Sequence, residues 1–209
     1  MFLVFEGVEG SGKSTQARLL SEWLSGAGIA NVLTREPGGT QVGEEIRQAL
    51  LHGGDVPART ELLLMVAARA AFVEQVVRPA LDRGDVVIGD RYELSSFAYQ
   101  GYGRGVDLED VRRVNAFATG GLRPDLTILL DVEPHEGAAR RQRAGAAADR
   151  IERAGDDFHR AVAGAYRLLS ETEEDVAVVA GDASPEAVHA RIRGLLRDRF
   201  PETFPPAEG

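Results

Sequence analysis

Short, unbroken apolar runs alternate along the chain with segments whose apolar residues recur at helical spacing. The runs predict strands at residues 2–5, 30–33, 85–88, 126–130 and 176–179. The helical spacing predicts helices at residues 14–24, 41–51, 60–78, 94–100, 108–118, 134–143, 156–169 and 185–199, with Ser184 as the cap of the last. Because strands without polar positions are covered on both faces, the pattern indicates a parallel sheet in an α/β fold.

Polar residues follow the predicted strands directly, at residues 6–9, 35–39, 90–91 and 131. In a parallel sheet ligands bind beyond the carboxyl ends of the strands, so these residues are expected to share one site. Neither a repeat nor a long linker divides the chain. We therefore expect a single domain over residues 1–199, followed by a loose tail at 200–209.

Composition narrows the class of protein. The chain of 209 residues is 44% hydrophobic and 27% charged, as globular domains are, and its lack of cysteine excludes disulfides and thiolate sites. Its apolar runs are shorter than the ~18 residues of a membrane span, and its start lacks the basic region of a signal peptide. A net charge of −9 argues against binding to nucleic acid or to acidic membranes. We expect a cytoplasmic protein.

A phosphate-binding motif, G-x-x-x-x-G-K-[ST], follows the first predicted strand and opens the first helix. It comprises Gly7, Val8, Glu9, Gly10, Ser11, Gly12, Lys13 and Ser14, and Thr15 comes next. The glycines let backbone N–H groups turn towards phosphate oxygens, and the helix N-terminus adds positive potential. The Lys13 amine suits the β- and γ-phosphates of ATP, and the Ser14 hydroxyl suits Mg²⁺.

Lys13 is the only lysine beside 23 arginines. A GTPase would need a second lysine in its base-recognition motif, and a nucleotide-driven motor is hard to fit into this length. A small kinase with a small second substrate remains.

Arg69 lies inside an apolar helical run and shares one helix face with Met65 and Phe72. A buried guanidinium requires a carboxylate or a ligand. The strip suits a nucleotide base with a polar edge, although an internal ion pair is an open alternative.

An acid and a base, Asp90 and Arg91, follow the third predicted strand. Asp90 can hold Mg²⁺ or the acceptor, and Arg91 can clamp a phosphate; a structural ion pair is the alternative. The next helix places Ser96, Tyr99 and Gln100 on one face.

Arginines surround an Ala- and Gly-rich stretch towards the C-terminal half. Arg140, Arg141, Arg143 and Arg150 indicate a lid at about residues 140–152 that closes over the transferring phosphoryl group and excludes water. A solvated basic face is the alternative for each of them.

The segments FEGVEGSGKST, TREPGGT, AAR, DRYELSSFAYQGYGRG, RPDLTILLDV and DRIE, in this order, resemble the thymidylate kinase family over nearly the whole chain. The resemblance implies the fold of the P-loop nucleoside monophosphate kinases, with a five-stranded parallel sheet flanked by helices and a short arginine-rich lid. It implies transfer of the γ-phosphate of ATP to dTMP with Mg²⁺, giving dTDP and ADP, by a homodimer.

The resemblance also assigns roles to the matching residues. Arg69 would bind the thymine edge, and Tyr99 would disfavour a ribose 2′-hydroxyl. Arg91 would grip the acceptor phosphate beside Asp90. Other dTMP contacts would come from Glu9, Arg35, Pro37, Ser96 and Gln100, with a cis bond before Pro37.

The family has two variants, which differ in where the catalytic arginine lies, and this chain also departs from many members at one position. Gly10 stands where one variant carries the catalytic arginine, so Arg143 or Arg150 of the lid would take that role. Met65 stands where many members have a phenylalanine on thymine, and either its thioether or Phe72 would cover the ring. A kinase of dUMP or of mixed substrates and a non-catalytic nucleotide-binding regulator are the alternatives.

Overall fold

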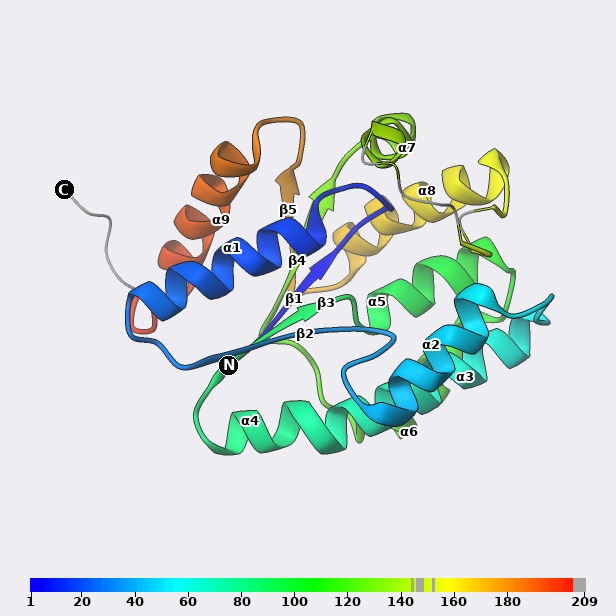
Figure 1. The fold of residues 1–209 in the computed structure, drawn as a ribbon, viewed down its shortest axis with the longest axis horizontal. Helices are drawn as coiled ribbons and strands as arrows, with labels where there is room; N and C mark the ends of the chain where they lie inside the picture. The colour runs from blue at the N-terminus through cyan, green and yellow to red at the C-terminus, as the bar shows by residue number, and fades with distance from the viewer. Residues whose placement is uncertain (144, 146–148, 152, 205–209) are drawn as a thin grey trace.

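A parallel sheet forms the centre of the molecule (Figure 1). The computed structural model describes residues 1–143, 145, 149–151 and 153–204, and within them five strands lie in the order β2-β3-β1-β4-β5. These are β1 (Phe2–Glu6), β2 (Asn31–Arg35), β3 (Val86–Asp90), β4 (Leu126–Asp131) and β5 (Val176–Ala180). All four strand pairs in that part of the chain are parallel, which confirms the predicted sheet.

Helices connect the strands where the apolar spacing predicts them. They are α1 (Lys13–Gly26), α2 (Gln41–His52), α3 (Ala58–Phe72), α4 (Arg78–Asp82), α5 (Glu93–Ser96), α6 (Leu108–Thr119), α7 (Pro134–Arg143), α8 (Asp156–Thr172) and α9 (Pro185–Arg199). The predicted helix at 60–78 continues from α3 into α4 through a π-helical turn, η1 (Val73–Val77), and the one at 94–100 runs from α5 into a second, η2 (Phe97–Gly103). The Ser184 hydroxyl accepts a hydrogen bond from Ala187 N–H, as expected of a cap.

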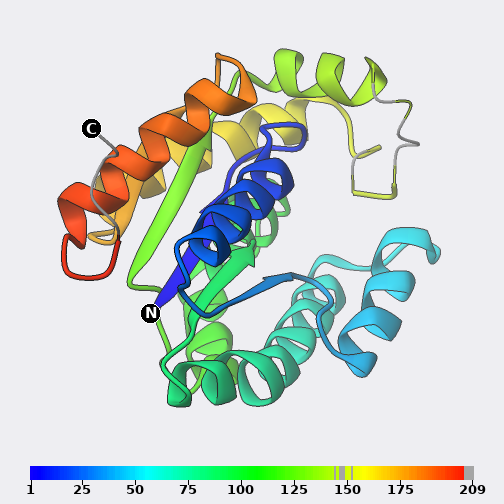
Figure 2. The same ribbon diagram turned by 60° about the vertical axis from the view of Figure 1, so that its left-hand side comes forward.

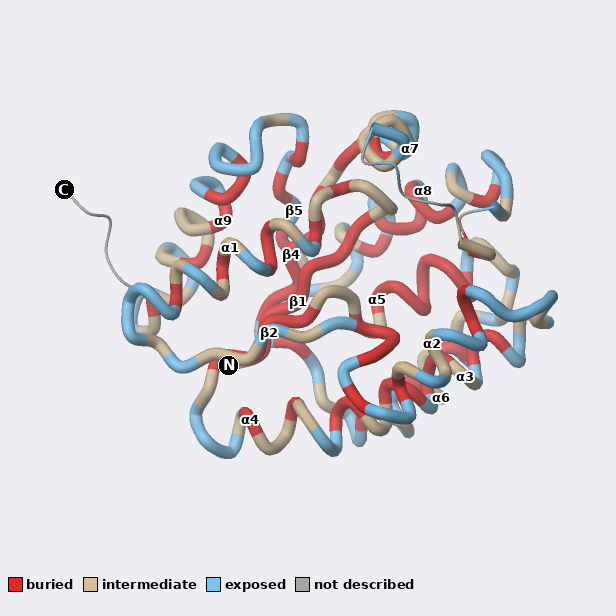
Figure 3. Tube along the Cα trace, viewed as in Figure 1, coloured by how far each residue is buried: buried red, intermediate tan, exposed pale blue. Residues whose placement is uncertain are grey.

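The side chains of β1 alternate between two cores. Leu3 and Phe5 pack with the core beneath α1 and α9, which lie beside each other on one face of the sheet (Figure 2). Phe2 and Val4 pack on the other face with Phe72. Strand β1 is therefore buried throughout, and β3 and β4 are buried up to their last residues, Asp90 and Asp131 (Figure 3). The rigid carboxyl ends of these strands can hold functional residues in place.

Exposure departs from the prediction at the sheet edges and on α3. The outer strands β2 and β5 are buried only in part, with Leu33 44% and Val178 53% exposed. The residues from Leu62 to Ala68 are apolar almost all round the helix, which predicts that this part of α3 is buried. That prediction is wrong for Leu63, which is 58% exposed. Phe117 on α6, a helix packed against α3, is 91% exposed. Each of these two packed helices thus exposes a large apolar side chain.

The C-terminal segment is ordered at its beginning. Phe204, within the expected loose tail, is buried and stacks on Trp23 at a centroid distance of 5.9 Å. Residues 205–209 lie outside the described residues, as do 144, 146–148 and 152 of the expected lid. Among the helices that the structure describes, none is long and apolar enough to cross a membrane.

Candidate active site

The phosphate-binding motif forms the loop between β1 and α1. Gly7, Gly10 and Gly12 all have positive φ, a conformation that favours glycine. Lys13 Nζ donates hydrogen bonds to the carbonyl oxygens of Gly7 at 3.0 Å and Val8 at 2.8 Å. Burial and the charge of Arg91 lower the pKa of Lys13 to about 8. The lowered pKa means that the nearby carboxylates do not fully compensate the charged amine. An anion bound in the loop would supply the missing negative charge.

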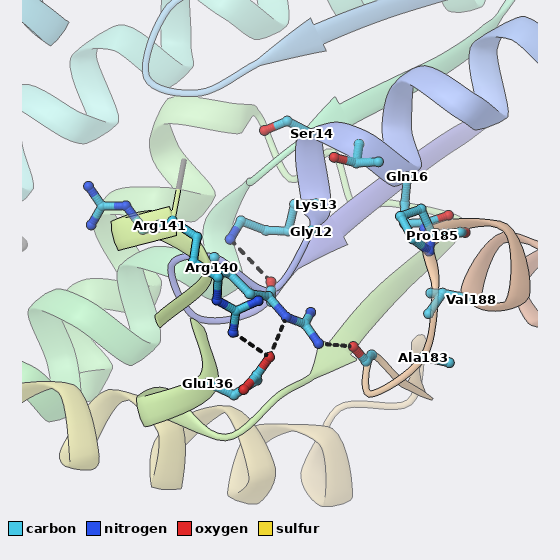
Figure 4. A pocket seen from close by; sticks show the side chains of 15 residues that line it. Gly12, Lys13, Ser14, Gln16, Glu136, Arg140, Arg141, Ala183, Pro185 and Val188 are labelled. Atoms are coloured by element: carbon cyan, nitrogen blue, oxygen red, sulfur yellow. Dashed lines mark hydrogen bonds and ion pairs between the residues drawn. The ribbon is translucent and has the colours of Figure 1, made fainter. Parts of the chain in front are cut away.

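A pocket of about 670 Å³ opens over this loop (Figure 4). It is lined by Gly10, Ser11, Gly12, Lys13, Ser14, Thr15, Gln16, Glu136, Arg140, Arg141, Arg143, Gly181, Ala183, Pro185 and Val188. Its walls are α1 with the phosphate loop, the arginine-bearing helix α7, and the segment from β5 into α9. Glu136 accepts from Arg140 Nε at 3.0 Å and pairs with Arg143 Nη2 at 3.5 Å. The structure thus brings three expected lid arginines to the phosphate loop.

Ser14, which lines this pocket, meets Asp90 beside it. The Ser14 hydroxyl donates to Asp90 Oδ2 at 2.5 Å, joining the start of α1 to the end of β3. A hydroxyl and a carboxylate are the oxygen donors that Mg²⁺ accepts, and Mg²⁺ in kinases commonly takes one or two protein oxygens together with phosphates. Among the described residues there is no cluster of three or more His, Cys, Asp or Glu that could bind a metal alone. The pair therefore fits a nucleotide-bound Mg²⁺.

Arg91 joins the phosphate loop to the acceptor side. Its Nη2 donates to Glu9 Oε1 at 2.7 Å, and the Tyr99 hydroxyl donates to the other oxygen of Glu9. Burial would raise the pKa of Glu9, but Arg91, Lys13 and Tyr99 outweigh burial and lower it to about 2. Arg91 has φ of 77°, a strained conformation for a residue other than glycine. Such strain is held in place by the surrounding contacts, which here include Tyr166 at 3.2 Å.

Arg69 is fully buried and nearly saturated with hydrogen bonds. Its Nε pairs with Glu36 Oε2 at 2.7 Å, and its Nη1 donates to Ser96 Oγ at 2.8 Å and to Asn115 Oδ1. Its Nη2 donates to the Tyr92 carbonyl oxygen at 2.9 Å. Burial lowers the pKa of Arg69, but the charge of Glu36 outweighs burial and raises it. Of five N–H groups on a guanidinium, one on Nη2 has no partner within the described residues.

A second buried carboxylate, that of Glu61, accepts hydrogen bonds from residues of the acceptor side. Gln100 Nε2 donates to Glu61 Oε1 at 2.9 Å, and Arg150 Nη2 lies 2.7 Å from Glu61 Oε2. Arg150 Nε also donates to the Leu50 carbonyl oxygen at 2.8 Å. The Gln100 amide oxygen is buried and has no partner among the residues described. Arg150 therefore does not line the pocket that holds Lys13 and Arg143.

The remaining residues that the resemblance assigns to dTMP differ in exposure. Met65 is 8% exposed, whereas Phe72 is fully buried and lies 6.5 Å from the Tyr92 ring. The Glu36–Pro37 bond is cis, as the resemblance implies. Arg35, which is more than half exposed, pairs with Glu44 at 3.2 Å.

Sequence reasoning did not single out Glu61, Asn115 or Tyr166. Each is buried or has a buried hydroxyl and holds an expected site residue by a hydrogen bond. A signal was present for Glu61, because it stands four and eight residues before Met65 and Arg69 on one helix face. Asn115 and Tyr166 likewise carry a polar group on the apolar face of a helix, which would have indicated a buried hydrogen-bonding role.

Comparison with known proteins gives a consistent result. Residues 5–192 match the model of the family described as thymidylate kinase. A thymidylate kinase of Leifsonia xyli subsp. xyli is 48% identical over 200 residues, covering 95% of each chain. One of Synechococcus sp. (strain JA-3-3Ab) is 46% identical over 206 residues, covering 98% of this chain and 99% of its own. The crystal structure of thymidylate kinase from Ehrlichia chaffeensis superposes with a TM-score of 0.76 at 31% identity, covering 94% of this chain and 98% of that one.

Proposed function

This chain belongs to the thymidylate kinase family, and on that premise we propose how its residues transfer a phosphoryl group from ATP to dTMP. The fold is that of the P-loop nucleoside monophosphate kinases, and the enzyme is an ATP-dependent kinase that converts dTMP to dTDP. The comparisons do not favour a kinase of another nucleotide or a non-catalytic regulator.

The donor side is the phosphate loop with α7. We assign the ATP phosphates to the backbone N–H groups of residues 7–15, with Lys13 at the β- and γ-phosphates. The contact of Lys13 with two loop carbonyls supports this role, because phosphate oxygens offer the amine a better partner than neutral carbonyls do. Ser14 and Asp90 would hold Mg²⁺, which supplies charge neutralisation of the phosphates when bound.

The acceptor side is assembled around Arg91 and Arg69. We assign the dTMP phosphate to Arg91, which lies one residue from Asp90 and is bonded to Glu9 of the phosphate loop. We assign the thymine edge to Arg69, whose remaining N–H can donate to a carbonyl oxygen. Ser96 accepts a hydrogen bond from this arginine, and the buried amide oxygen of Gln100, which is held by Glu61, can accept a hydrogen bond from the nucleotide.

Catalysis then rests on position and charge, because phosphoryl transfer demands little covalent work from the protein. The attacking group is a phosphate oxygen of dTMP, which carries its own negative charge. Lys13 and the arginines of α7 would stabilise the charge that spreads over the transferring group. Arg143 fits the role of catalytic arginine, since it lines the pocket over Lys13. The same role for Arg150 stays a prediction and would require its guanidinium to leave Glu61.

Base selectivity is expected to be incomplete. Thymine differs from uracil by one methyl group, which a pocket discriminates by about 1–3 kcal/mol. Met65, with its flexible thioether, is the residue proposed to cover the ring. Measurable phosphorylation of dUMP is therefore expected, at lower kcat/KM than for dTMP.

We also propose a homodimer. Leu63 on α3 and Phe117 on α6 are both exposed, on two helices that pack together, and we assign the contact with the second copy to these helices. Light scattering should report twice the 22.5 kDa mass for the wild type, and one chain mass for the double variant Leu63→Glu/Phe117→Glu. A wild-type mass of one chain contradicts the dimer. The kinase domain would comprise residues 1–199 and act in the cytoplasm.

The observation that carries the assignment is the joining of the two sides by Arg91 and Glu9. Incubation with γ-labelled ATP and dTMP should yield labelled dTDP, and Lys13→Met should abolish this product while the variant still folds, as judged by circular dichroism. Undiminished product formation by Lys13→Met would overturn the assignment of the donor site.

A further inference from the structure

Two glycines bring the phosphate loop and α7 into direct backbone contact. A β-carbon added to Gly10 would lie 2.1 Å from the Gly137 carbonyl oxygen, and one added to Gly137 would lie 2.2 Å from the Glu9 carbonyl oxygen. Real β-carbons essentially never come within 3.0 Å of such atoms. Even alanine would therefore push the loop and the helix apart, by roughly 0.9 Å at Gly10 and roughly 0.8 Å at Gly137.

The two positions have different reasons for glycine. Gly10 has φ of 73°, so its backbone conformation already favours glycine. Gly137 lies inside α7, where glycine has no conformational advantage and weakens a helix by about 1 kcal/mol relative to alanine. The close approach to Glu9 is the feature of the structure that requires glycine there.

The residues of α7 that follow and precede this contact place charged side chains in the pocket. Glu136 precedes Gly137 and holds both Arg140 and Arg143, whose side chains line the space over the phosphate loop. Arg140 Nη2 also donates to the Gly181 carbonyl oxygen at 2.9 Å. The position of these arginines relative to Lys13 is thus set by how closely α7 approaches the loop.

We propose that Gly137 is a positioning residue of the kinase, which seats α7 on the phosphate loop and thereby places the α7 arginines at the transferring phosphoryl group. The inference rests on the proposed function. It also explains Gly10: a side chain there would displace the helix whose arginines supply the charge. Residues 9, 10 and 137 together form the contact between the phosphate loop and α7, which are two walls of the donor site.

The test compares Gly137→Ala with Gly164→Ala. Both glycines are helical, but a β-carbon at Gly164 on α8 would meet nothing within 4 Å. Because a displacement near 1 Å can cost about a hundredfold in rate, Gly137→Ala should lower kcat by about 10- to 100-fold. The KM for ATP should rise more than the KM for dTMP, because α7 lines the donor pocket and meets the acceptor side through Glu9. Gly164→Ala should match the wild type.

A double variant separates placement of the arginines from damage to the loop. If Gly137 acts through Arg143, then Gly137→Ala should have much less effect in an Arg143→Met background than in the wild type. Alanine favours the helix by about 1 kcal/mol, which opposes the cost of the displaced contact, so a melting temperature close to that of the wild type is expected for Gly137→Ala. Equal activity of the two alanine variants, or full additivity with Arg143→Met, would overturn the proposal. Absence of dTMP phosphorylation by the wild type would instead refute the proposed function.

Discussion

The guanidinium of Arg91 lies 2.7 Å from the carboxylate of Glu9, so the residue that follows β3 is bonded to the middle of the phosphate loop. The donor and acceptor sides are therefore held at a fixed separation by a partly buried ion pair. In phosphoryl transfer this separation matters, because the attacking oxygen must lie close to the γ-phosphorus.

Glu9→Gln should weaken this link. Charge-assisted hydrogen bonds contribute about 1.5–3 kcal/mol, so the free energy of unfolding at pH 7 should fall by roughly that amount. The pKa of Glu9 is lowered from 4.5 to about 2, so its contribution is present above pH 4.5 and is lost as the pH falls towards 2. Denaturant unfolding of both proteins from pH 7 to pH 2 measures this. Parallel curves over that range would contradict the pairing.

Lys13 should make ATP binding dependent on pH. Because its pKa is about 8 without nucleotide and phosphates favour its charged form, affinity for ATP should decrease as the pH rises above 8. Binding near pH 9 should take up a proton, which calorimetry in two buffers of different ionisation enthalpy detects. Between pH 8 and 10.5 the unfolded chain binds the extra proton, so this residue makes the free energy of unfolding rise with pH. Lys13→Met should remove both effects.

Arg69 should be important for stability as well as for binding dTMP. Removing one partner of a buried ion pair leaves the other charge uncompensated, so Arg69→Met should lower the free energy of unfolding by about 3–5 kcal/mol. The double variant Arg69→Met/Glu36→Gln should recover part of that loss. Arg18→Met, which removes an exposed pair, should cost less than about 1 kcal/mol. Equal losses for the two single variants would contradict the buried role of Arg69.

Arg143 and Arg150 should have separable effects. Arg143 lines the donor pocket, so Arg143→Met should lower kcat, by about 10²- to 10³-fold if it stabilises the transition state. Arg150 pairs with Glu61, the partner of Gln100, so Arg150→Met should chiefly raise the KM for dTMP. Steady-state kinetics with each substrate varied in turn separate the two effects. A loss confined to kcat in Arg150→Met would instead support the predicted catalytic role of that arginine.

The sequence predicted the elements well where one local rule applies. The strands of the sheet centre, the phosphate loop and the Ser184 cap follow from unbroken apolar runs, glycine spacing and a hydroxyl before a proline. The edge strands were harder, because a strand with one neighbour keeps an exposed face, as Leu33 shows. The prediction that Leu63 is buried was wrong, because the sequence does not distinguish an apolar side chain in a core from one on an exposed surface.

The partners of the site residues could not be predicted in the same way. Arg69 was expected to need a carboxylate or a ligand, but its pairing with Glu36 and Asn115 depends on the relative placement of segments far apart in the chain. The placement of Arg150 on Glu61 is of the same kind, since spacing within the lid says nothing about α3. The contact of Gly10 with Gly137 likewise arises only when β1 and β4 pair.

The most direct test of the account is an ADP-release assay with Mg-ATP and dTMP, dUMP, dCMP, dAMP, dGMP or the ribonucleotide of thymine. The account predicts the highest kcat/KM for dTMP, measurable but lower turnover of dUMP, and poor use of the ribonucleotide because Tyr99 is assigned to the 2′ side. A higher kcat/KM for any other monophosphate would contradict the assignment of Arg69 and Met65 to thymine, and no turnover of dTMP would contradict the central claim.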